Sequence, residues 1–145
     1  MPVLAHFNIA RMKVDWDDPA FADFRDALDP VNADSEAHPG FIWRLKSAED
    51  DSPELVAFEN EGWLVNLTAW TDLDSLKAFV RSLGHLAVMR RRGEWFETTP
   101  ANLVLWWLPE GERPTFEDAM RRRDHLLAHG PGPEAFNFRQ PMPPL

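Results

Sequence analysis

The alternation of apolar and polar residues along the chain predicts a set of β-strands. Residues 3–12 alternate with a period of two, which places successive side chains on opposite faces of a strand. The segments 41–46 and 63–70 are rich in β-branched and aromatic residues, which favour strands. Residues 102–108 form a nearly continuous apolar run, which is typical of a strand with both faces covered.

A helix is predicted to begin at Asp18, because this aspartate can cap the first turn and Pro19 suits the first helical position. Phe21 and Phe24 then recur at helical spacing. Pro30 lacks a backbone donor and interrupts helical hydrogen bonding. We therefore expect a break at Pro30, followed by a second short helix before the next strand.

The longest helix is expected within residues 71–96. Thr71 and Asp74 form a capping-box pattern at its start, and apolar residues repeat behind them at helical spacing. A last helix is predicted to begin at Thr115 and to end at Gly130, since glycine commonly terminates helices.

Two segments are expected to lack regular structure. The acidic, proline-containing stretch 47–62 is predicted to be a loop or a long hairpin connection, and it lacks the ligand spacing of a calcium loop. The proline-rich tail, about 131–145, is expected either to dock as an edge strand or to drape over the surface.

The order of these elements predicts an α+β protein with a ferredoxin-like βαββαβ arrangement and an extra C-terminal helix. In this arrangement the helices cover one face of an antiparallel sheet. An apolar second face, carrying Trp43 or Trp107 depending on the register, is most simply buried against a second copy of the chain. The sequence therefore predicts a homodimer.

Composition narrows the range of partners and chemistries. A length of 145 residues fits a single domain, 1–145, and a formal net charge of -9 disfavours nucleic acid and anionic membranes as partners. The chain has no cysteine and no tyrosine, which excludes thiol and phenolate chemistry, but it has seven tryptophans that suit a core or an aromatic pocket. Without a secretory signal pattern or a membrane-span pattern, the expected location is cytoplasmic.

Several enzyme classes lack their motifs here. The chain contains no nucleophile elbow, no P-loop and no dinucleotide-binding glycine pattern. Serine hydrolase and nucleotide-dependent chemistries are therefore set aside.

Five stretches of the sequence together resemble the DUF3291 family over nearly the whole chain: HFNIAR, PGFIWRL, AWTDLDSLKAFVRSLGH…MRRRGEWF, VLWWLPEGERPTFEDA and LLAHGPGPEAFNFR. That family is placed among dimeric α/β barrel proteins, a superfamily that includes antibiotic-biosynthesis monooxygenases, haem-degrading enzymes and cofactor-free oxygenases. The resemblance implies an antiparallel sheet that forms a dimeric α/β barrel. It implies an activity only weakly, because the family has no settled function and a fold does not specify a function.

The layout is similar to that of the haem-degrading branch in one respect. An asparagine of the first strand and a histidine of the helix after the third strand face one cavity in that branch, and Asn8 and His85 occupy the matching elements here. The branch also carries a tryptophan on this helix, where this chain has Phe79. The resemblance thus implies that haem is a possible cofactor, with His85 as the ligand of its iron; otherwise no cofactor is expected.

His85 lies beside the apolar stripe of its helix, so its side chain can point into a cleft between helix and sheet. There it could bind a metal or act as a base near neutral pH. The alternative is a half-buried histidine that hydrogen-bonds to the backbone.

Candidate ligand-binding residues are grouped on the predicted strands by the period-two alternation. His6 groups with Asn8, and Thr68 groups with the candidates Asn66 and Trp70, while Arg44 lies on the strand 41–46. If these side chains share a face, they form either a pocket wall or an internal polar network, and the sequence leaves both open.

Three further candidates lie in the second half of the chain. Arg92 could anchor an acidic group such as a haem propionate, or pair with a surface carboxylate. Trp106 is expected to form an aromatic wall. His125 and His129 are four residues apart on a helix, a spacing that can chelate a metal or can simply favour the helix end.

Three functions remain open at this point. The first is an oxygenase that acts on a planar hydrophobic molecule, with His85 and Asn8 as catalytic residues. The second is a non-catalytic protein that binds haem or another small ligand. The third is a structural dimer without a ligand.

Overall fold

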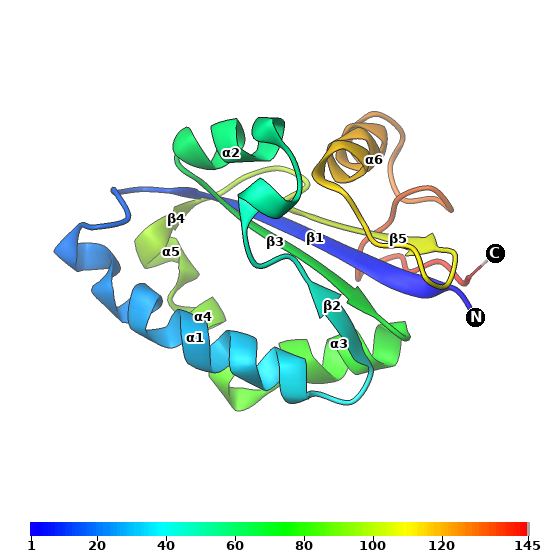
Figure 1. Cartoon of the computed structure of the whole chain (residues 1–145), viewed down its shortest axis with the longest axis horizontal. Coiled ribbons are helices and arrows are strands. Elements are labelled where there is room, and N and C mark those ends of the chain that lie inside the picture. Colours follow the sequence, from blue (N-terminus) through cyan, green and yellow to red (C-terminus); the bar gives the residue numbers. More distant parts are fainter. Residues whose placement is uncertain (145) are drawn as a thin grey trace.

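The computed structural model describes residues 1–144 as an antiparallel β-sheet with helices on both faces (Figure 1). Its long central strand coincides with the first strand that the sequence predicts. The strands are β1 (Val3–Met12), β2 (Phe41–Arg44), β3 (Trp63–Trp70), β4 (Phe96–Glu97) and β5 (Leu103–Leu108). The prediction of four main strands is confirmed, and β4 is a two-residue addition.

The strand order across the sheet is β2, β3, β1, β5, and β4 pairs with the far end of β1. The two strands of each βαβ unit are thus separated by a strand of the other unit, which is the split arrangement of the ferredoxin-like fold. Within residues 1–144 the sheet is open and does not close into a barrel.

The helical segments are two 3-10 turns and six helices. They are η1 (Pro19–Phe21), α1 (Ala22–Ala37), η2 (Ala48–Asp50), α2 (Pro53–Asn60), α3 (Leu73–Val80), α4 (Leu83–Arg90), α5 (Arg92–Trp95) and α6 (Phe116–His129). The cap at Asp18 is confirmed, because its side chain accepts a hydrogen bond from the backbone N–H of Ala20, 2.8 Å away. The last helix also agrees with the prediction, with Thr115 as its N-cap and Gly130 as its C-cap.

The predicted break at Pro30 is wrong. Helix α1 runs through Pro30 without interruption over 16 residues. A proline inside a helix loses one backbone hydrogen bond, but apolar side chains on both sides of it are packed: Leu28 against one core cluster and Val31 against another. Packing on both sides of the proline outweighs the missing bond.

The segment 47–62 is not a loop, as the sequence had indicated, but contains η2 and α2. The hydroxyl of Ser52 accepts a hydrogen bond from the backbone N–H of Leu55 at 3.2 Å, and Pro53 occupies the first turn of α2. Leu55 is fully buried against the sheet. The local signals for a helix were therefore present, although the acidic composition favoured a loop.

The predicted long helix of residues 71–96 is divided into α3, α4 and α5. Its N-cap is Asp72, whose carboxylate accepts a hydrogen bond from the backbone N–H of Ser75 at 2.7 Å, and not Thr71. Ser82 adopts an extended conformation, with φ -64° and ψ 152°, which ends α3 and allows α4 to begin in a new direction.

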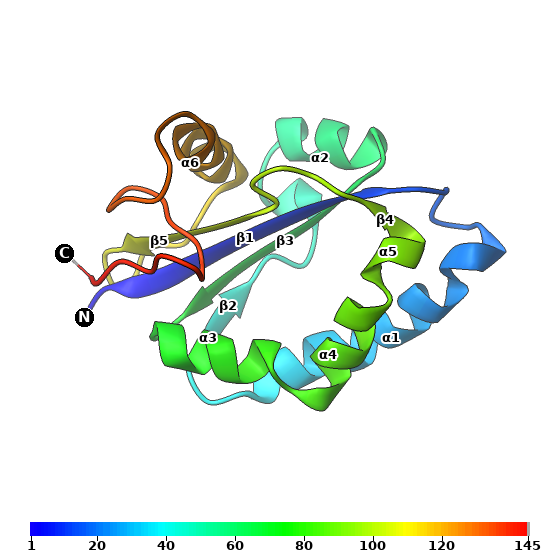
Figure 2. The ribbon, with the colours of Figure 1, turned by 180° about the vertical axis from the view of Figure 1, so that it is seen from behind.

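The sheet separates two layers of helices (Figures 1 and 2). Helices α1, α3, α4 and α5 lie on one side of the sheet, and α2 and α6 lie on the other. The second face is therefore covered within a single chain by side chains of α2 and α6, including Leu55, Phe116 and Leu126. This corrects the argument that an uncovered apolar face needs a second copy of the chain, and the homodimer stays a prediction.

The C-terminal segment docks along the free edge of β5. Leu105 and Phe136 exchange two backbone hydrogen bonds of 2.9 Å, and Phe136 is fully buried. The indole N–H of Trp107 donates to the carbonyl of Met142 at 2.9 Å. The tail thus forms one isolated bridge at the sheet edge and then covers Trp107.

Candidate functional site

Polar side chains form rows across the face of the sheet that α1, α3 and α4 cover. In the register of the sheet, His6 of β1 lies opposite Thr68 of β3, and Asn8 lies opposite Asn66. Arg44 of β2 lies opposite Thr68 on the other side. Directly opposed residues of neighbouring strands share a face, so the polar residues grouped by alternation in the sequence do lie on one face.

His85 faces this row from α4. Its ring packs edge-on against Phe79, with ring centroids 5.1 Å apart, and Phe79 stacks on Trp70 at 5.5 Å. Because Trp70 belongs to the same sheet face as His6 and Thr68, this chain of aromatic contacts ties the imidazole of His85 to the sheet. His85 is also close enough to His6 for its charge to affect the pKa of that residue.

Some polar side chains on this side of the sheet are open to solvent. Asn66 is exposed, because β2 ends opposite Thr68 and leaves this part of β3 at an edge, and Asn8 and His85 are half-buried. No residue of α4 is buried, whereas the preceding helix α3 buries Leu76 and Phe79. We call this group of residues the histidine cleft; its members are His6, Asn8, Asn66, Thr68 and His85.

The break between α3 and α4 determines the orientation of His85. In a continuous helix the carbonyl of Val80 would accept a hydrogen bond from the backbone four residues later. The break leaves this carbonyl free, and Nδ1 of His85 bonds to it at 3.0 Å. A carbonyl oxygen only accepts, so Nδ1 carries the proton, and Nε2 of the neutral ring keeps a free lone pair.

His6 is held by a buried relay of hydrogen bonds. Its Nδ1 lies 3.1 Å from Oγ1 of Thr68, and the indole N–H of Trp70 donates to the same Oγ1 at 2.9 Å. All three side chains are buried. The relay therefore fixes the position of His6 at the base of the histidine cleft.

Both imidazoles are neutral at neutral pH. Burial, with the nearby His85 as a second and smaller cause, lowers the pKa of His6 to about 4. Burial also lowers the pKa of His85, and its hydrogen bond to Val80 opposes this effect only in part. A neutral His85 can accept a proton, whereas His6 stays uncharged over the physiological range.

Two predicted arginines already have partners on the protein. Nε of Arg44 donates to Oε1 of Glu36 at 2.7 Å, which lowers the pKa of Glu36. The guanidinium of Arg92 donates to the side-chain oxygen of Asn102, with distances of 3.0 and 3.3 Å, when the Asn102 amide is oriented to satisfy both groups. Neither guanidinium is therefore free for a ligand without breaking these contacts.

Trp106 lies on the opposite face of the sheet from His85. It pairs with Ala5 of β1, packs with Phe116 and Leu126, and is fully buried. Adjacent residues of a strand point to opposite faces. Leu105 points toward α3, so its neighbour Trp106 points toward α6. Trp106 and Trp70 cannot line the same cleft.

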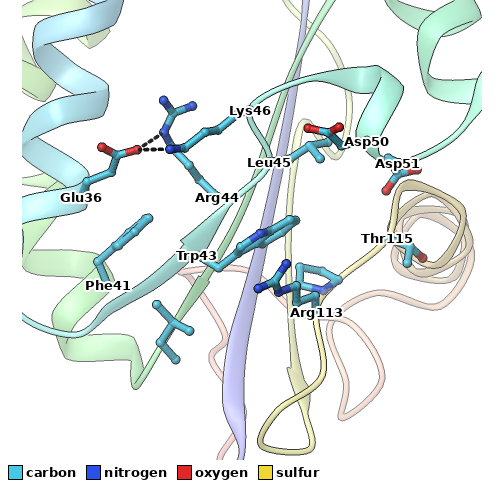
Figure 3. A pocket seen from close by; sticks show the side chains of 12 residues that line it. Glu36, Phe41, Trp43, Arg44, Leu45, Lys46, Asp50, Asp51, Arg113 and Thr115 are labelled. Carbon is cyan, nitrogen blue, oxygen red and sulfur yellow. Dashed lines mark hydrogen bonds and ion pairs between the residues drawn. The ribbon is translucent and has the colours of Figure 1, made fainter.

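A hollow opens at the free edge of β2, away from the histidine cleft (Figure 3). It has a volume of about 590 Å³ and lies between the end of α1 and the start of α6. The guanidinium of Arg113 lies 5.6 Å from the ring centroid of Trp43 there, and Arg44 and Lys46 both face Glu36. Of the predicted site residues, only Arg44 lines this hollow.

The histidines of α6 have no third ligand. The rings of His125 and His129 lie 4.6 Å apart, and His125 faces Glu134 at 3.5 Å. Among residues 1–144 no group of three or more histidine or carboxylate side chains is placed to hold a metal ion.

His6 and Thr68 are not among the candidate site residues predicted from the sequence, although the alternation groups them with such candidates. The signal was available, because the alternation of β1 groups His6 with Asn8. Alternation within one strand does not show how β1 pairs with β3, and this pairing brings Thr68 against His6 and Asn66 against Asn8.

The fold and the cleft define a ferredoxin-like α+β protein with a polar site between its sheet and one helix layer. The chain belongs to the DUF3291 family, described as a domain of unknown function, whose family model matches residues 3–145. No curated protein matches the chain.

Solved structures share this fold. NE2512, a protein of unknown function from Nitrosomonas europaea, is 18% identical with a TM-score of 0.53, and 79% of this chain covers 97% of that one. Rv0793 from Mycobacterium tuberculosis is 16% identical with a TM-score of 0.52, over 79% of this chain and 100% of that one. A putative antibiotic biosynthesis monooxygenase from Nitrosomonas europaea is 16% identical with a TM-score of 0.48, over 73% and 86%. The first two establish the fold, and none of the three extends to the chemistry of this chain.

No helix within residues 1–144 is both long enough and apolar enough to span a membrane.

Proposed function

We propose that this protein binds a small, planar, mainly apolar molecule in the histidine cleft. The observation that carries this proposal is the orientation of His85: Val80 holds its Nδ1, and its Nε2 is left free on the side of the sheet where Asn8 and Asn66 are open to solvent. Phe79, whose ring packs between those of Trp70 and His85, supplies an apolar side chain beside it. Pockets for small ligands combine such apolar walls with a few polar groups that orient the ligand.

The chemistry that this arrangement supports is removal of a proton from the bound molecule. Neutral His85 can act as the general base through Nε2. The side chains of Asn8 and Asn66 form no hydrogen bond with another residue of the described chain, so their amide N–H groups are available to an oxyanion. Oxygenation of the resulting anion is the reaction class that the resemblance to cofactor-free oxygenases implies.

A binding experiment tests the proposal. Fluorescence of the protein is measured while planar aromatic compounds are added, and the titration is repeated with His85→Ala and with His129→Ala. We expect saturable quenching in the unchanged protein, because Trp70 lies beside the cleft, and at least a tenfold weaker affinity for His85→Ala only. Equal affinities for all three proteins would exclude the histidine cleft as the binding site.

A second candidate function is the binding of haem, which the family resemblance implies. The iron ligand fits, because a histidine that donates Nδ1–H to a backbone carbonyl and keeps Nε2 free is the usual metal-binding arrangement. Bound haem would supply an iron centre for oxygen chemistry. The propionate partner fits less well, since Arg92 is already bonded to Asn102.

Absorption spectra decide this second candidate. If His85 holds haem iron, adding haem to the protein produces a sharp Soret band that is lost in His85→Ala and kept in His129→Ala. Consumption of the bound haem with a reductant and oxygen would then identify an enzyme, and a stable spectrum would identify a carrier. A protein that binds neither haem nor aromatic compounds would be the structural protein of the third hypothesis.

A further inference from the structure

We infer that His6 is a second functional residue of the histidine cleft, and that His6 and His85 together recognise a neutral, weakly acidic hydroxyl group on a planar ring. This inference rests on the proposed function, because it concerns the molecule bound in the same cleft. It assigns His6 the role of hydrogen-bond donor and His85 the role of acceptor.

The tautomer of His6 follows from the hydrogen bonds of Thr68. A hydroxyl group has one proton and two lone pairs. The indole N–H of Trp70 donates to one lone pair of Oγ1, and the only other partner of Oγ1 among residues 1–144 is Nδ1 of His6. If Nδ1 also donated, the buried hydroxyl proton would have no acceptor, which is costly.

The Thr68 hydroxyl therefore donates to Nδ1 of His6, and the proton of the neutral ring resides on Nε2. Nε2 has no partner within residues 1–144, and it is not among the fully sealed unpaired nitrogens, which are those of Trp95 and Trp106. This N–H therefore keeps some exposure and has no partner among the described residues, which leaves it available to a ligand.

His85 has the opposite tautomer. Its Nδ1–H is used by Val80, and Nε2 presents a lone pair. The cleft hence contains one neutral donor and one neutral acceptor, each fixed by a buried or backbone partner. Arg44, which lies on the same sheet face, is paired with Glu36 of α1 at 2.7 Å.

This pair of groups selects among ligands by their chemistry. A hydroxyl group satisfies both imidazoles, because its proton can go to Nε2 of His85 while its oxygen accepts from Nε2–H of His6. A carboxylate would place a negatively charged oxygen against the lone pair of Nε2 of His85. An ether oxygen has no proton to donate to this nitrogen. The ring of Phe79, packed edge-on against His85, places an aromatic side chain next to these groups, which suits an aromatic ligand.

The bound hydroxyl group can transfer its proton to His85. The ligand O–H bond breaks, an N–H bond forms at Nε2 of His85, and the electron pair remains on the ligand oxygen. His85 becomes an imidazolium, and the oxyanion accepts a hydrogen bond from His6. No oxidant or reductant takes part in this step.

The tautomers are tested first in the unchanged protein. Two-bond proton–nitrogen correlation spectra of the imidazole rings, recorded at neutral pH, distinguish the two tautomers of each histidine. We expect the Nε2–H form for His6 and the Nδ1–H form for His85. The Nδ1–H form for both residues would overturn the inference.

Ligand choice is tested with three probes of similar size: para-nitrophenol, para-nitroanisole and para-nitrobenzoate. We expect the phenol to bind at least tenfold more tightly than the other two and to show its phenolate absorption band below its ordinary pKa. Thr68→Val removes the donor that keeps the proton of His6 on Nε2, so it should weaken binding of the phenol about tenfold, and Thr68→Ser should preserve binding. His85→Gln should abolish the phenolate band.

The outcomes separate this inference from the proposed function. Equal binding of the phenol and the anisole, with no phenolate band, would end the inference and leave a ligand-binding cleft. Failure of all three probes together with other planar aromatic compounds would end the proposed function, while the tautomer spectra would still decide the assignment of His6.

Discussion

Nδ1 of His85 bonds to the carbonyl oxygen of Val80, 3.0 Å away, across the break between α3 and α4. A helix end leaves carbonyl groups without partners, and here an imidazole takes the place of a backbone N–H. The break therefore has two effects: it turns α4 away from the line of α3, and it leaves the second ring nitrogen of His85 unprotonated. An uninterrupted helix would have provided neither.

The stability of the protein is expected to fall as the pH is lowered through the range where His6 titrates. Its pKa is about 4 in the fold against 6.5 in the unfolded chain, so the unfolded chain binds more protons between these values. The contribution of His6 to the free energy of unfolding is therefore fully present above pH 6.5. It is lost progressively, by about 3 kcal/mol, as the pH is lowered toward 4.

Urea unfolding at several pH values between 7 and 4 would measure this loss. In His6→Gln the free energy of unfolding should depend clearly less on pH between 6.5 and 5. His129→Gln, at an exposed helix end, should show the same dependence as the unchanged protein. Identical slopes for the two variants would contradict a buried neutral His6.

Trp70 and Trp106 are both fully buried tryptophans, but only Trp70 makes a hydrogen bond through its indole nitrogen. Replacing Trp70 with phenylalanine should lower the free energy of unfolding by about 1 to 2 kcal/mol more than the same change at Trp106, because the oxygen of Thr68 loses a donor. Chemical denaturation of the two variants measures the difference.

The same two variants test the assignment of faces. Only Trp70→Phe should change the affinity for a planar ligand, since Trp106 lies on the other side of the sheet. Weaker ligand binding in Trp106→Phe would indicate that the site is under α6 instead.

Gly40 is expected to tolerate no side chain. It has a φ of 88°, and a β-carbon at this position would overlap the side chains of Ser75 and Thr71. We expect Gly40→Ala to lower the free energy of unfolding by about 2 kcal/mol or more.

Gly84 provides the matched control, because it lies in α4, where a β-carbon would have no neighbouring atom within 4 Å. Gly84→Ala should raise stability by about 0.5 to 1 kcal/mol through higher helix propensity. A large loss of stability in Gly84→Ala would mean that α4 packs closely on its surroundings, contrary to an open cleft.

The C-terminal segment should contribute to stability through Phe136. This side chain is fully buried, and its backbone pairs with Leu105 at the sheet edge. Phe136→Ala is expected to cost about 3 to 5 kcal/mol, the usual range for a large buried aromatic side chain. Phe138→Ala, at a partly buried position nearby, should cost clearly less, and thermal unfolding of both would show it.

Much of the fold could be predicted from the sequence because it depends on local patterns. The alternation in β1, the apolar run of β5 and the caps at Asp18 and Thr115 all involve residues near one another in the chain. The order of these elements was enough to indicate a ferredoxin-like arrangement.

Two predictions that the structure contradicts, a break at Pro30 and a loop over 47–62, failed for one physical reason, which is packing between distant segments. Leu28 and Val31 hold α1 together around Pro30, and burial of Leu55 makes a helix of an acidic stretch. Sequence patterns report local preference, and tertiary contacts of this kind override it.

For the site, the sequence by itself determined which side chains share a strand face, since alternation is a local property: His6 goes with Asn8, and Trp70 with Thr68. Only the tertiary structure decided that these two sets meet, because the register between β1 and β3 is a contact between residues some sixty positions apart. It also decided that His85 faces them while Trp106 does not. Both facts depend on which helix layer covers which face, and no single segment of the chain carries that information.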